Sequence, residues 1–219
     1  MQSTHQGGLS QPVHIPEDHG FIEGVLEVPA NPTGLVLFAH GSGSSRQSPR
    51  NNFVARVLRD QGVGTLLMDL LTPEEDTDYQ MRFDIALLTR RLLQVTRWVQ
   101  GHPAVGHLPI GYFGASTGAA SALCAAAAMG EKIHAVVSRG GRPDLAGQRD
   151  LIRVRAPTLL LVGGLDTEVL ELNQAAYALL SCTKKFSIVP GATHLFEEPG
   201  TLVQVASQAA AWFSHHLVA

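Results

Sequence analysis

The chain has 219 residues, of which 45% are hydrophobic, and its 16 basic and 19 acidic residues leave a formal net charge of -3. This length allows one domain with a sizeable buried core. The negative balance and the scarcity of lysine argue against a nucleic-acid-binding surface, which needs a concentrated basic face.

The N-terminal segment, residues 1–20, is polar and contains no apolar stretch typical of a secretion signal. The apolar runs elsewhere are too short to span a bilayer. We therefore expect a soluble cytoplasmic protein with no membrane partner and a single domain over residues 1–219. Cys124 and Cys182 lie in stretches with helical character and lack metal-ligand spacing, so both are expected to be small apolar residues rather than a disulfide.

Apolar runs alternate with amphipathic stretches along the chain, which predicts an α/β fold with a mostly parallel sheet flanked by helices on both faces. Strands are expected at residues 21–28, 35–39, 64–70, 110–113, 133–138, 158–162 and 186–189. Helices are expected at residues 53–61, 81–99, 117–129, 168–180 and 202–217. The helix at 81–99 has the clearest signal, because its apolar residues recur at spacings of three and four.

Ser116 lies in the sequence Gly-Ala-Ser-Thr-Gly at 114–118, between an expected strand and an alanine-rich expected helix. A nucleophile elbow has this strand, sharp turn and helix context. A serine hydroxyl is a weak nucleophile until a turn presents it beside a general base. The context predicts a catalytic Ser116, and the alternative is an ordinary strand-to-helix turn.

Asp166 directly follows an expected strand, where a carboxylate can point into a crevice at the carboxyl ends of the strands. We expect it to orient the catalytic histidine and stabilise the imidazolium. The alternative is a helix-capping role, because Asp166 also precedes an expected helix. Asp144 and Asp69 are the other candidates for the acid.

His194 lies in the loop after the last expected strand, from which an imidazole can reach back over the sheet toward Ser116. His215 and His216 also follow Asp166, but both lie in the expected C-terminal helix. His194 is therefore the predicted general base. The alternative is a loop histidine without a chemical role.

Acyl transfer also needs two backbone N–H groups at the place where the oxyanion forms. We expect one from Thr117, the residue after the nucleophile, and the other from Ser42. Ser42 lies in the His-Gly-Ser-Gly-Ser-Ser loop at 40–45, after a short apolar strand. Such a loop is also an ordinary connection, so its position before the unit that leads to Ser116 supports the prediction.

Together, the loop at 40–45, the elbow at 114–118, Asp166 and His194 make the chain resemble the α/β-hydrolases, in particular the small dienelactone-hydrolase-like group. The resemblance covers nearly the whole chain from about residue 34. It implies an α/β-hydrolase fold with an antiparallel sheet edge, a triad of Ser116, Asp166 and His194, and no metal or organic cofactor. Dienelactone hydrolases proper have a cysteine at the elbow, so Ser116 indicates a serine esterase.

The segment at 139–156 is too short for a large cap domain, which predicts an open crevice for small-molecule esters, lactones or thioesters. An acyltransferase or perhydrolase with the same triad remains an alternative, as does a non-catalytic ligand-binding protein of this fold. The sequence does not decide between a monomer and a homodimer.

Four arginines follow expected strands near the crevice, where guanidinium groups can bind a carboxylate or phosphate of the substrate. Arg46 and Arg50 follow the loop at 40–45, and Arg139 and Arg142 follow the strand at 133–138. The alternative is solvated surface charge or pairing with Asp144.

Overall fold

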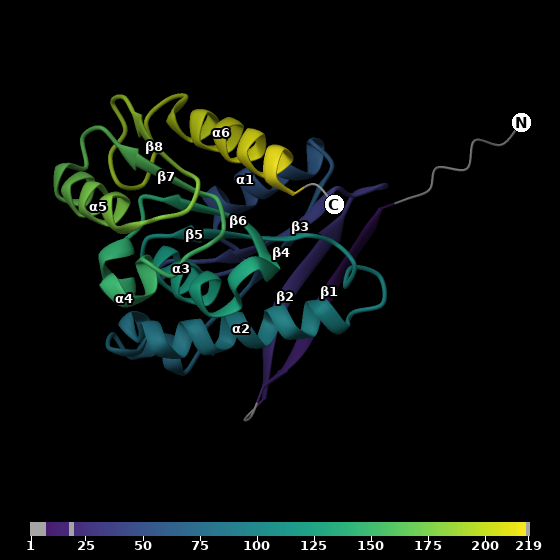
Figure 1. The fold of residues 1–219 in the computed structure, drawn as a ribbon. Helices are drawn as coiled ribbons and strands as arrows, with labels where there is room; N and C mark the ends of the chain where they lie inside the picture. The colour runs from purple at the N-terminus through teal and green to yellow at the C-terminus, as the bar shows by residue number, and fades with distance from the viewer. Residues whose placement is uncertain (1–7, 18–19, 218–219) are drawn as a thin grey trace, which may run out of the picture.

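The computed structural model describes residues 8–17 and 20–217. One sheet contains eight strands in the order β1-β2-β4-β3-β5-β6-β7-β8 (Figure 1). The strands from β4 to β8 in this order are parallel, whereas β2 pairs antiparallel with β4 and β1 pairs antiparallel with β2. The predicted mostly parallel sheet with an antiparallel edge is confirmed.

The helices and strands alternate along most of the chain. The strands are β1 (Leu9–Glu17), β2 (Gly20–Val28), β3 (Gly34–Ala39), β4 (Val63–Met68), β5 (Ile110–Ala115), β6 (Ile133–Arg139), β7 (Thr158–Gly163) and β8 (Lys184–Val189). The α-helices are α1 (Pro49–Asp60), α2 (Ile85–Gly101), α3 (Thr117–Met129), α4 (Gly147–Leu151), α5 (Thr167–Leu179) and α6 (Thr201–His216). No helix within the described residues combines the length and apolarity needed to cross a membrane.

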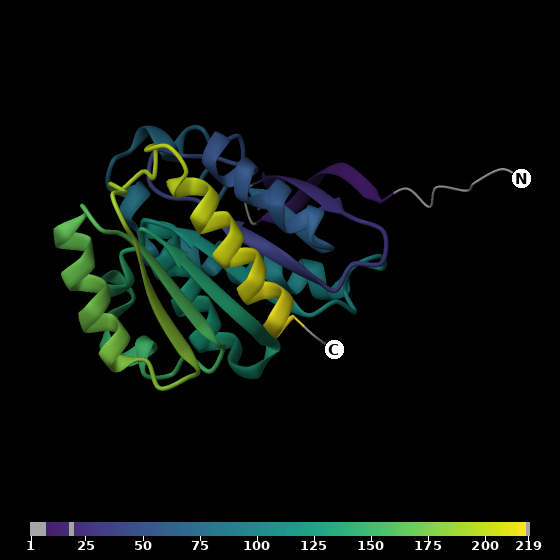
Figure 2. The ribbon, with the colours of Figure 1, turned by 90° about the horizontal axis from the view of Figure 1, so that it is seen from above.

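Helices cover both faces of the sheet. Helices α1 and α6 pack together on one face, and α2 and α3 pack together on the other (Figures 1 and 2). Between β6 and β7 the chain forms only the 3₁₀ turn Pro143–Ala146 and the short α4. This agrees with the expected absence of a large cap domain.

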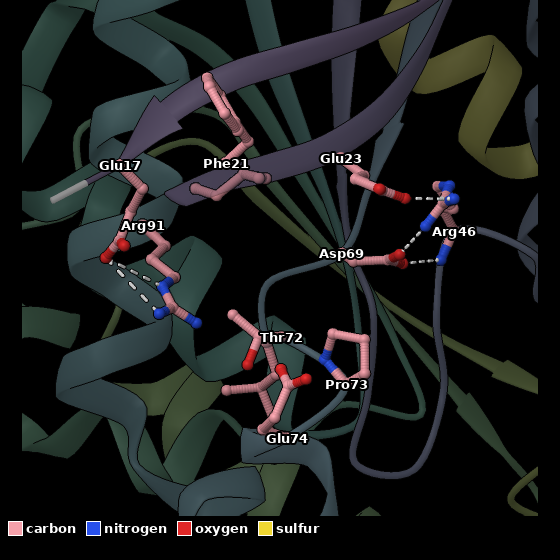
Figure 3. A pocket seen from close by; sticks show the side chains of 11 residues that line it. Glu17, Phe21, Glu23, Arg46, Asp69, Thr72, Pro73, Glu74 and Arg91 are labelled. Atoms are coloured by element: carbon pink, nitrogen blue, oxygen red, sulfur yellow. Dashed lines mark hydrogen bonds and ion pairs between the residues drawn. The ribbon is translucent and has the colours of Figure 1, made fainter. Parts of the chain in front are cut away.

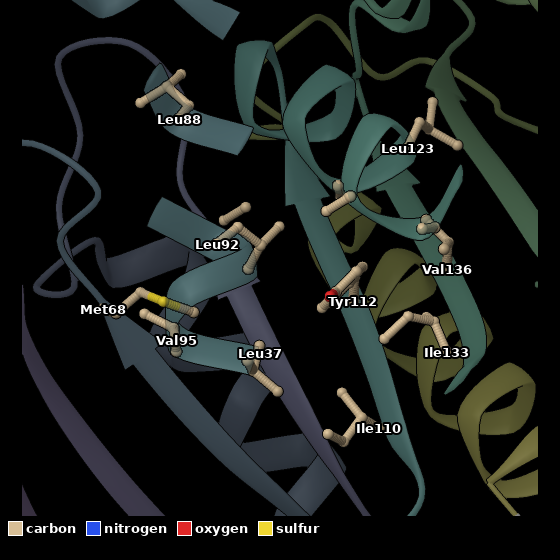
Figure 4. Close-up of a cluster of buried hydrophobic side chains, with 14 of the residues drawn as sticks. Leu37, Met68, Leu88, Leu92, Val95, Ile110, Tyr112, Leu123, Ile133 and Val136 are labelled. Atoms are coloured by element: carbon tan, nitrogen blue, oxygen red, sulfur yellow. The ribbon is translucent and has the colours of Figure 1, made fainter. Parts of the chain in front are cut away.

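Strand β5 contributes side chains to both hydrophobic layers. Ile110 and Tyr112 pack in the layer that contains α2 (Figure 4). Phe113 packs in the layer that contains α6. The buried Tyr112 hydroxyl bonds the Thr96 hydroxyl at 2.7 Å, so the polar end of this ring has a partner in the core. The central strand that ends at Ser116 is therefore anchored from both faces.

The N-terminal segment differs from its expected description as a polar segment. Residues 9–17 form β1, whereas residues 1–7 and 18–19 lie outside the described residues. Val13 and Ile15 are buried while their neighbours in the chain are not. The prolines at 12 and 16 weaken the strand signal, but an edge strand tolerates proline because one side of its backbone needs no partner.

Two helices begin at positions that differ from the predicted ones. Helix α2 begins at Ile85 rather than at 81, because the Asp84 carboxylate accepts a hydrogen bond from the Leu87 N–H and caps the helix. Helix α1 begins at Pro49 rather than at 53, with Ser48 as its cap. Asp84 and Ser48 are both residue types that commonly cap the N-terminus of a helix.

His40 connects the carboxyl ends of β3 and β4. Its Nδ1 lies 3.0 Å from the Gly41 carbonyl oxygen, and its Nε2 accepts a hydrogen bond from the Leu70 N–H at 2.9 Å. These partners require a neutral ring with the proton on Nδ1. The side chain is buried, and burial lowers its pKa below the ordinary value of 6.5. The loop that follows β3 is thus fixed at its first residue.

This lowered pKa predicts a loss of stability in mild acid. The unfolded chain binds a proton at His40 below about pH 6.5, and the folded chain binds it only at lower pH. The free energy of unfolding should therefore fall as the pH drops from 6.5 toward 5, by up to about 1.4 kcal/mol per pH unit from this group. Urea unfolding at several pH values measures this change in the free energy of unfolding.

His40→Gln should make this pH dependence shallower, because glutamine can donate and accept hydrogen bonds but does not titrate. The same change at the exposed His107 is the matched control. An unchanged slope in His40→Gln would show that His40 does not contribute to acid sensitivity.

Candidate active site

The candidate residues meet at the edge of the sheet where the parallel strands end. The chain leaves β3 through α1 on one face, and it enters β5 from α2 on the other face. Ligand sites in open α/β sheets form outside the carboxyl ends of the strands at such a reversal of direction. The loop after β3 and the turn after β5 therefore flank the expected crevice.

Ser116 occupies a strained turn between β5 and α3. Its φ is 50° and its ψ is -121°, values that a residue with a side chain adopts only when its surroundings enforce them. A Cβ at Gly114 would lie 2.5 Å from the Ala119 Cα, and one at Gly118 would collide with the Ala39 carbonyl oxygen. The two glycines of the motif are thus required by the close packing of β5, α3 and β3.

The loop after β3 lies against this turn. A Cβ at Gly41 would lie 2.9 Å from the Ser116 Cβ, so the loop backbone approaches the candidate nucleophile directly. The Ser42 N–H donates a hydrogen bond to the Thr117 hydroxyl at 3.0 Å. Thr117 is the first residue of α3, where backbone N–H groups have no partner within the helix. The structure therefore brings together the two residues predicted to supply the oxyanion donors.

Asp166 and His194 form a pair at the ends of β7 and β8. The His194 Nδ1 lies 2.7 Å from the Asp166 Oδ2. Asp166 is the N-cap residue of α5, but its side chain makes no capping hydrogen bond to the helix. Asp166 therefore occupies the capping position, but its carboxylate contacts the imidazole instead of the helix N–H groups.

The other two acid candidates have different partners. Asp69 accepts hydrogen bonds from the Arg46 backbone N–H at 2.6 Å and from the Arg46 guanidinium. Asp144 forms two hydrogen bonds with the Arg142 guanidinium, at 2.9 and 2.8 Å. Among the three candidates, only Asp166 contacts a histidine of the described ranges.

The loop that carries His194 is fixed by a buried phenylalanine and by a close approach to β6. Phe196 is buried and has a φ of 57°, and a Cβ at Gly140 would lie 3.1 Å from the His194 carbonyl oxygen. Gly140 follows Arg139 in β6, the residue that pairs with Ala115 in β5. This places the imidazole loop over the strand next to Ser116.

Within the described residues, Ser116 Oγ and the His194 ring do not form a hydrogen bond. Catalytic hydrogen bonds are often long in ligand-free structures and shorten when substrate binds. The His194 side chain is 38% exposed. Ser116 and the Asp166–His194 pair thus lie at the same edge of the sheet without a hydrogen bond between them.

Two of the four candidate arginines are fully engaged by carboxylates. Arg46 pairs with Glu23 at 2.6 Å and with Asp69 (Figure 3). Arg142 pairs with Asp144, and this hydrogen bond raises the arginine pKa. Arg142 therefore agrees with the alternative of pairing with Asp144, whereas Arg46 pairs with two other carboxylates.

Arg50 and Arg139 lie together and differ from the other two. Arg50 pairs with Glu197 at 2.9 Å. Arg139 is 8% exposed, and within the described residues its Nε and Nη1 have no hydrogen-bond partner. Burial and the neighbouring Arg50 lower its pKa to about 10, so it remains charged at neutral pH.

A cavity of about 240 Å³ lies beside Arg46 (Figure 3). Its walls come from the β1–β2 hairpin and from the segment after β4, and they include Phe21, Ile22, Leu71 and Pro73. Ser116 is not among its lining residues, so this cavity adjoins the loop after β3 and does not contain the candidate triad. Within the described residues, no group of three or more His, Cys, Asp or Glu side chains is placed to hold a metal ion.

Two interactions that position the candidate site were not predicted from the sequence. The Thr117 side chain bonds the Ser42 amide, and Phe196 anchors the histidine loop in the core. Phe196 lies two residues after His194, so an apolar residue beside a candidate base was an available signal. The bond between Thr117 and Ser42 joins residues 75 positions apart, and no local pattern indicates it.

Comparison with known proteins identifies relatives over most of the chain. A solved dienelactone hydrolase from Anabaena variabilis is 50% identical, with a TM-score of 0.93, and the match covers 96% of this chain and 99% of that one. The protein Est1E from Butyrivibrio proteoclasticus has a TM-score of 0.80 at 17% identity, covering 94% and 98% of the two chains, which shows the shared fold alone.

A Mycobacterium tuberculosis protein, present in two strains and provisionally named a phosphoribosyl transferase, is 59% identical over 196 residues. That match covers 90% of this chain but only 44% of the relative, so the chain spans less than half the length of these relatives. No family model matches the chain. The 50% identity over nearly the full length of the Anabaena enzyme, with the same fold, shows that this chain belongs to the dienelactone hydrolase family of α/β-hydrolases.

Proposed function

We propose that this chain is a serine hydrolase that cleaves small carboxylic esters, lactones or thioesters. The observation that carries the proposal is the 2.7 Å contact between His194 and Asp166 at the edge of the sheet where the strained Ser116 turn lies. An aspartate that orients an imidazole near an exposed serine is the arrangement that activates a hydroxyl for acyl transfer.

In the first half of the proposed reaction, Ser116 Oγ attacks the substrate carbonyl carbon while His194 Nε2 takes the hydroxyl proton. Asp166 accepts the Nδ1–H and stabilises the imidazolium that forms. The carbonyl oxygen becomes an oxyanion, which the backbone N–H groups of Ser42 and Thr117 stabilise. His194 then gives its proton to the leaving alcohol or thiol, and an acyl-enzyme ester remains on Ser116.

In the second half, His194 takes a proton from water, and the resulting nucleophile attacks the acyl-enzyme. Collapse of the second tetrahedral intermediate returns the proton to Ser116 and releases the acid. The Thr117 hydroxyl holds the Ser42 amide beside the Thr117 amide before substrate arrives. We infer that this bond sets the spacing of the two donors, and that the oxyanion takes the place of the hydroxyl as acceptor.

The phosphoribosyl transferase name of the Mycobacterium relatives belongs to proteins more than twice as long as the matched region. The fold of this chain matches a dienelactone hydrolase over 99% of that enzyme. We therefore assign the proposed hydrolysis to this chain and do not extend the transferase activity to it.

An acyl acceptor other than water is the runner-up, because the same acyl-enzyme can be attacked by peroxide or an alcohol. Analysis of the reaction products separates the two proposals. Hydrolysis yields only the free acid when an alcohol is added, and acyl transfer yields the new ester or peracid as the main product.

Removal of the nucleophile should abolish turnover. Ser116→Ala should lower kcat/KM for p-nitrophenyl acetate or butyrate by at least about 10³-fold, because the residual rate comes only from binding and the oxyanion donors. Steady-state hydrolysis assays measure this, with exposed Ser207→Ala as the matched control. If folded wild-type protein does not turn over a broad panel of esters, the ligand-binding alternative is supported.

Asp166→Asn should lower kcat by roughly 10³- to 10⁴-fold near pH 7, because an amide at this position can donate to Nδ1 and favour the wrong imidazole tautomer. Asp144→Asn removes an equivalent charge from an aspartate that pairs with Arg142 and is the matched control. Equal losses of kcat in both variants would contradict a specific role for Asp166.

A further inference from the structure

Arg139 is a buried charge whose hydrogen-bonding capacity is largely unused. It is 8% exposed, and no described residue accepts a hydrogen bond from its Nε or Nη1. Its Nη2 lies 3.5 Å from the Asn51 Oδ1, which is the outer limit of a hydrogen bond. A buried guanidinium normally has a carboxylate or several acceptors, because an unpaired buried charge is costly.

A second positive charge increases this cost. Arg50 is close enough to Arg139 to disfavour its charged form, and the Arg50 Nε is also buried without a partner within the described part of the chain. Both Arg50 and Asn51 belong to the first turn of α1, a helix of 12 residues, where the helix dipole is positive. Three sources of positive potential therefore converge on one small region.

Among the residues that the structure describes, the groups next to Arg139 leave its charge without a carboxylate partner. The Phe196 ring lies 6.0 Å from the Arg139 guanidinium carbon and offers its face to the cation. Glu197 pairs with Arg50, not with Arg139, and the Glu197 side chain is 62% exposed. An ion pair that is this exposed contributes little stability, so a stronger anion can displace Glu197 at small cost.

The region also adjoins the candidate nucleophile. Arg139 pairs in register with Ala115, and its carbonyl oxygen accepts a hydrogen bond from the Ser116 N–H at 3.3 Å. Arg139 and Ala115 therefore point to the same face of the sheet, toward α1 and the loop after His194. The backbone of Arg139 is thus bonded directly to the backbone of the candidate nucleophile.

We propose that Arg139 and Arg50, with the first turn of α1, form a binding site for a small oxyanion, a carboxylate or a phosphate. Arg139 supplies the unpaired Nε and Nη1 donors, and Arg50 supplies a second positive charge. The bound oxyanion replaces Glu197 as the partner of Arg50 and enters from the solvent side. The oxyanion comes either from a free ion in solution or from an acid group on the substrate, and only the second source rests on the function proposed above.

The first experiment tests binding without any turnover. The melting temperature of Ser116→Ala is measured with and without inorganic phosphate or succinate, and NaCl keeps the ionic strength constant. The same measurement is made on the double variants Ser116→Ala/Arg139→Gln and Ser116→Ala/Arg149→Gln. Arg149 is an exposed arginine on α4, so Arg149→Gln is the control that removes one positive charge elsewhere. A ligand that binds only the folded state raises the melting temperature.

The proposal predicts that phosphate or succinate raises the melting temperature of Ser116→Ala and of the Arg149 variant, and that the Arg139 variant loses this response. Equal responses in all three proteins, or none in any of them, would overturn it. If Arg139→Gln does not fold, Arg139→Lys keeps the charge and should retain part of the response. A folded Arg139→Lys protein with the full response of the Arg149 variant would contradict the site.

The second experiment identifies the source of the oxyanion. The p-nitrophenyl monoester of succinate carries one free carboxylate, and the butyrate ester of equal chain length carries none. If the substrate supplies the oxyanion, Arg139→Gln should lower the succinate-to-butyrate ratio of kcat/KM by about 10- to 100-fold, as expected for lost charge-assisted hydrogen bonds. Arg149→Gln should keep the wild-type ratio.

An unchanged ratio together with the Arg139-dependent thermal response would assign the site to a free anion. An unchanged ratio without that response would overturn the site. If wild-type protein hydrolyses neither ester, the proposed function fails, but the thermal measurement on Ser116→Ala still decides whether the anion site exists.

Discussion

The close packing of three backbone segments around Ser116 is the constraint on which the site depends. Strand β5, helix α3 and the loop after β3 approach so closely that Gly41, Gly114 and Gly118 leave no room for side chains. This approach holds Ser116 at a φ of 50°, where a residue with a side chain is strained. The free energy of that strain is offset by the core that anchors β5 on both faces, including Phe113 and Tyr112.

Charge pairing divides the polar groups around the site into two kinds. Arg46 pairs with Glu23 and Asp69, and Arg142 pairs with Asp144, so both arginine charges have partners within the chain. Asp166 and His194 pair with each other, and Arg139 keeps buried donors without described partners.

Much of the architecture could be predicted from the sequence because local patterns encode it. The fully buried strands β3 and β7 appear as apolar runs, and Gly130 marks the end of the small-residue helix α3. Strand β1 was missed because its two prolines hide a short alternation that only pairing with β2 stabilises. The start of α1 at Ser48 and Pro49 carried a readable capping signal.

The candidate site was predictable only in part, and for physical reasons. Ser116, Asp166 and His194 each follow a strand, so the topology of a parallel sheet brings them to one edge. The partners of Arg46 and Arg50 depended on long-range contacts, such as that between Arg50 and Glu197, 147 residues apart. Arg142 pairs locally with Asp144. No periodicity shows that Arg139 is buried, because it is the last residue of its strand and the packing of α1 decides its environment.

The central claim is that Ser116 is an activated nucleophile, and covalent labelling with a fluorophosphonate probe tests it most directly. Intact-mass detection on wild type, Ser116→Ala and His194→Ala should show a single adduct on wild type, none on Ser116→Ala and much slower labelling of His194→Ala. No adduct on folded wild-type protein, or equal labelling of Ser116→Ala, would contradict the claim.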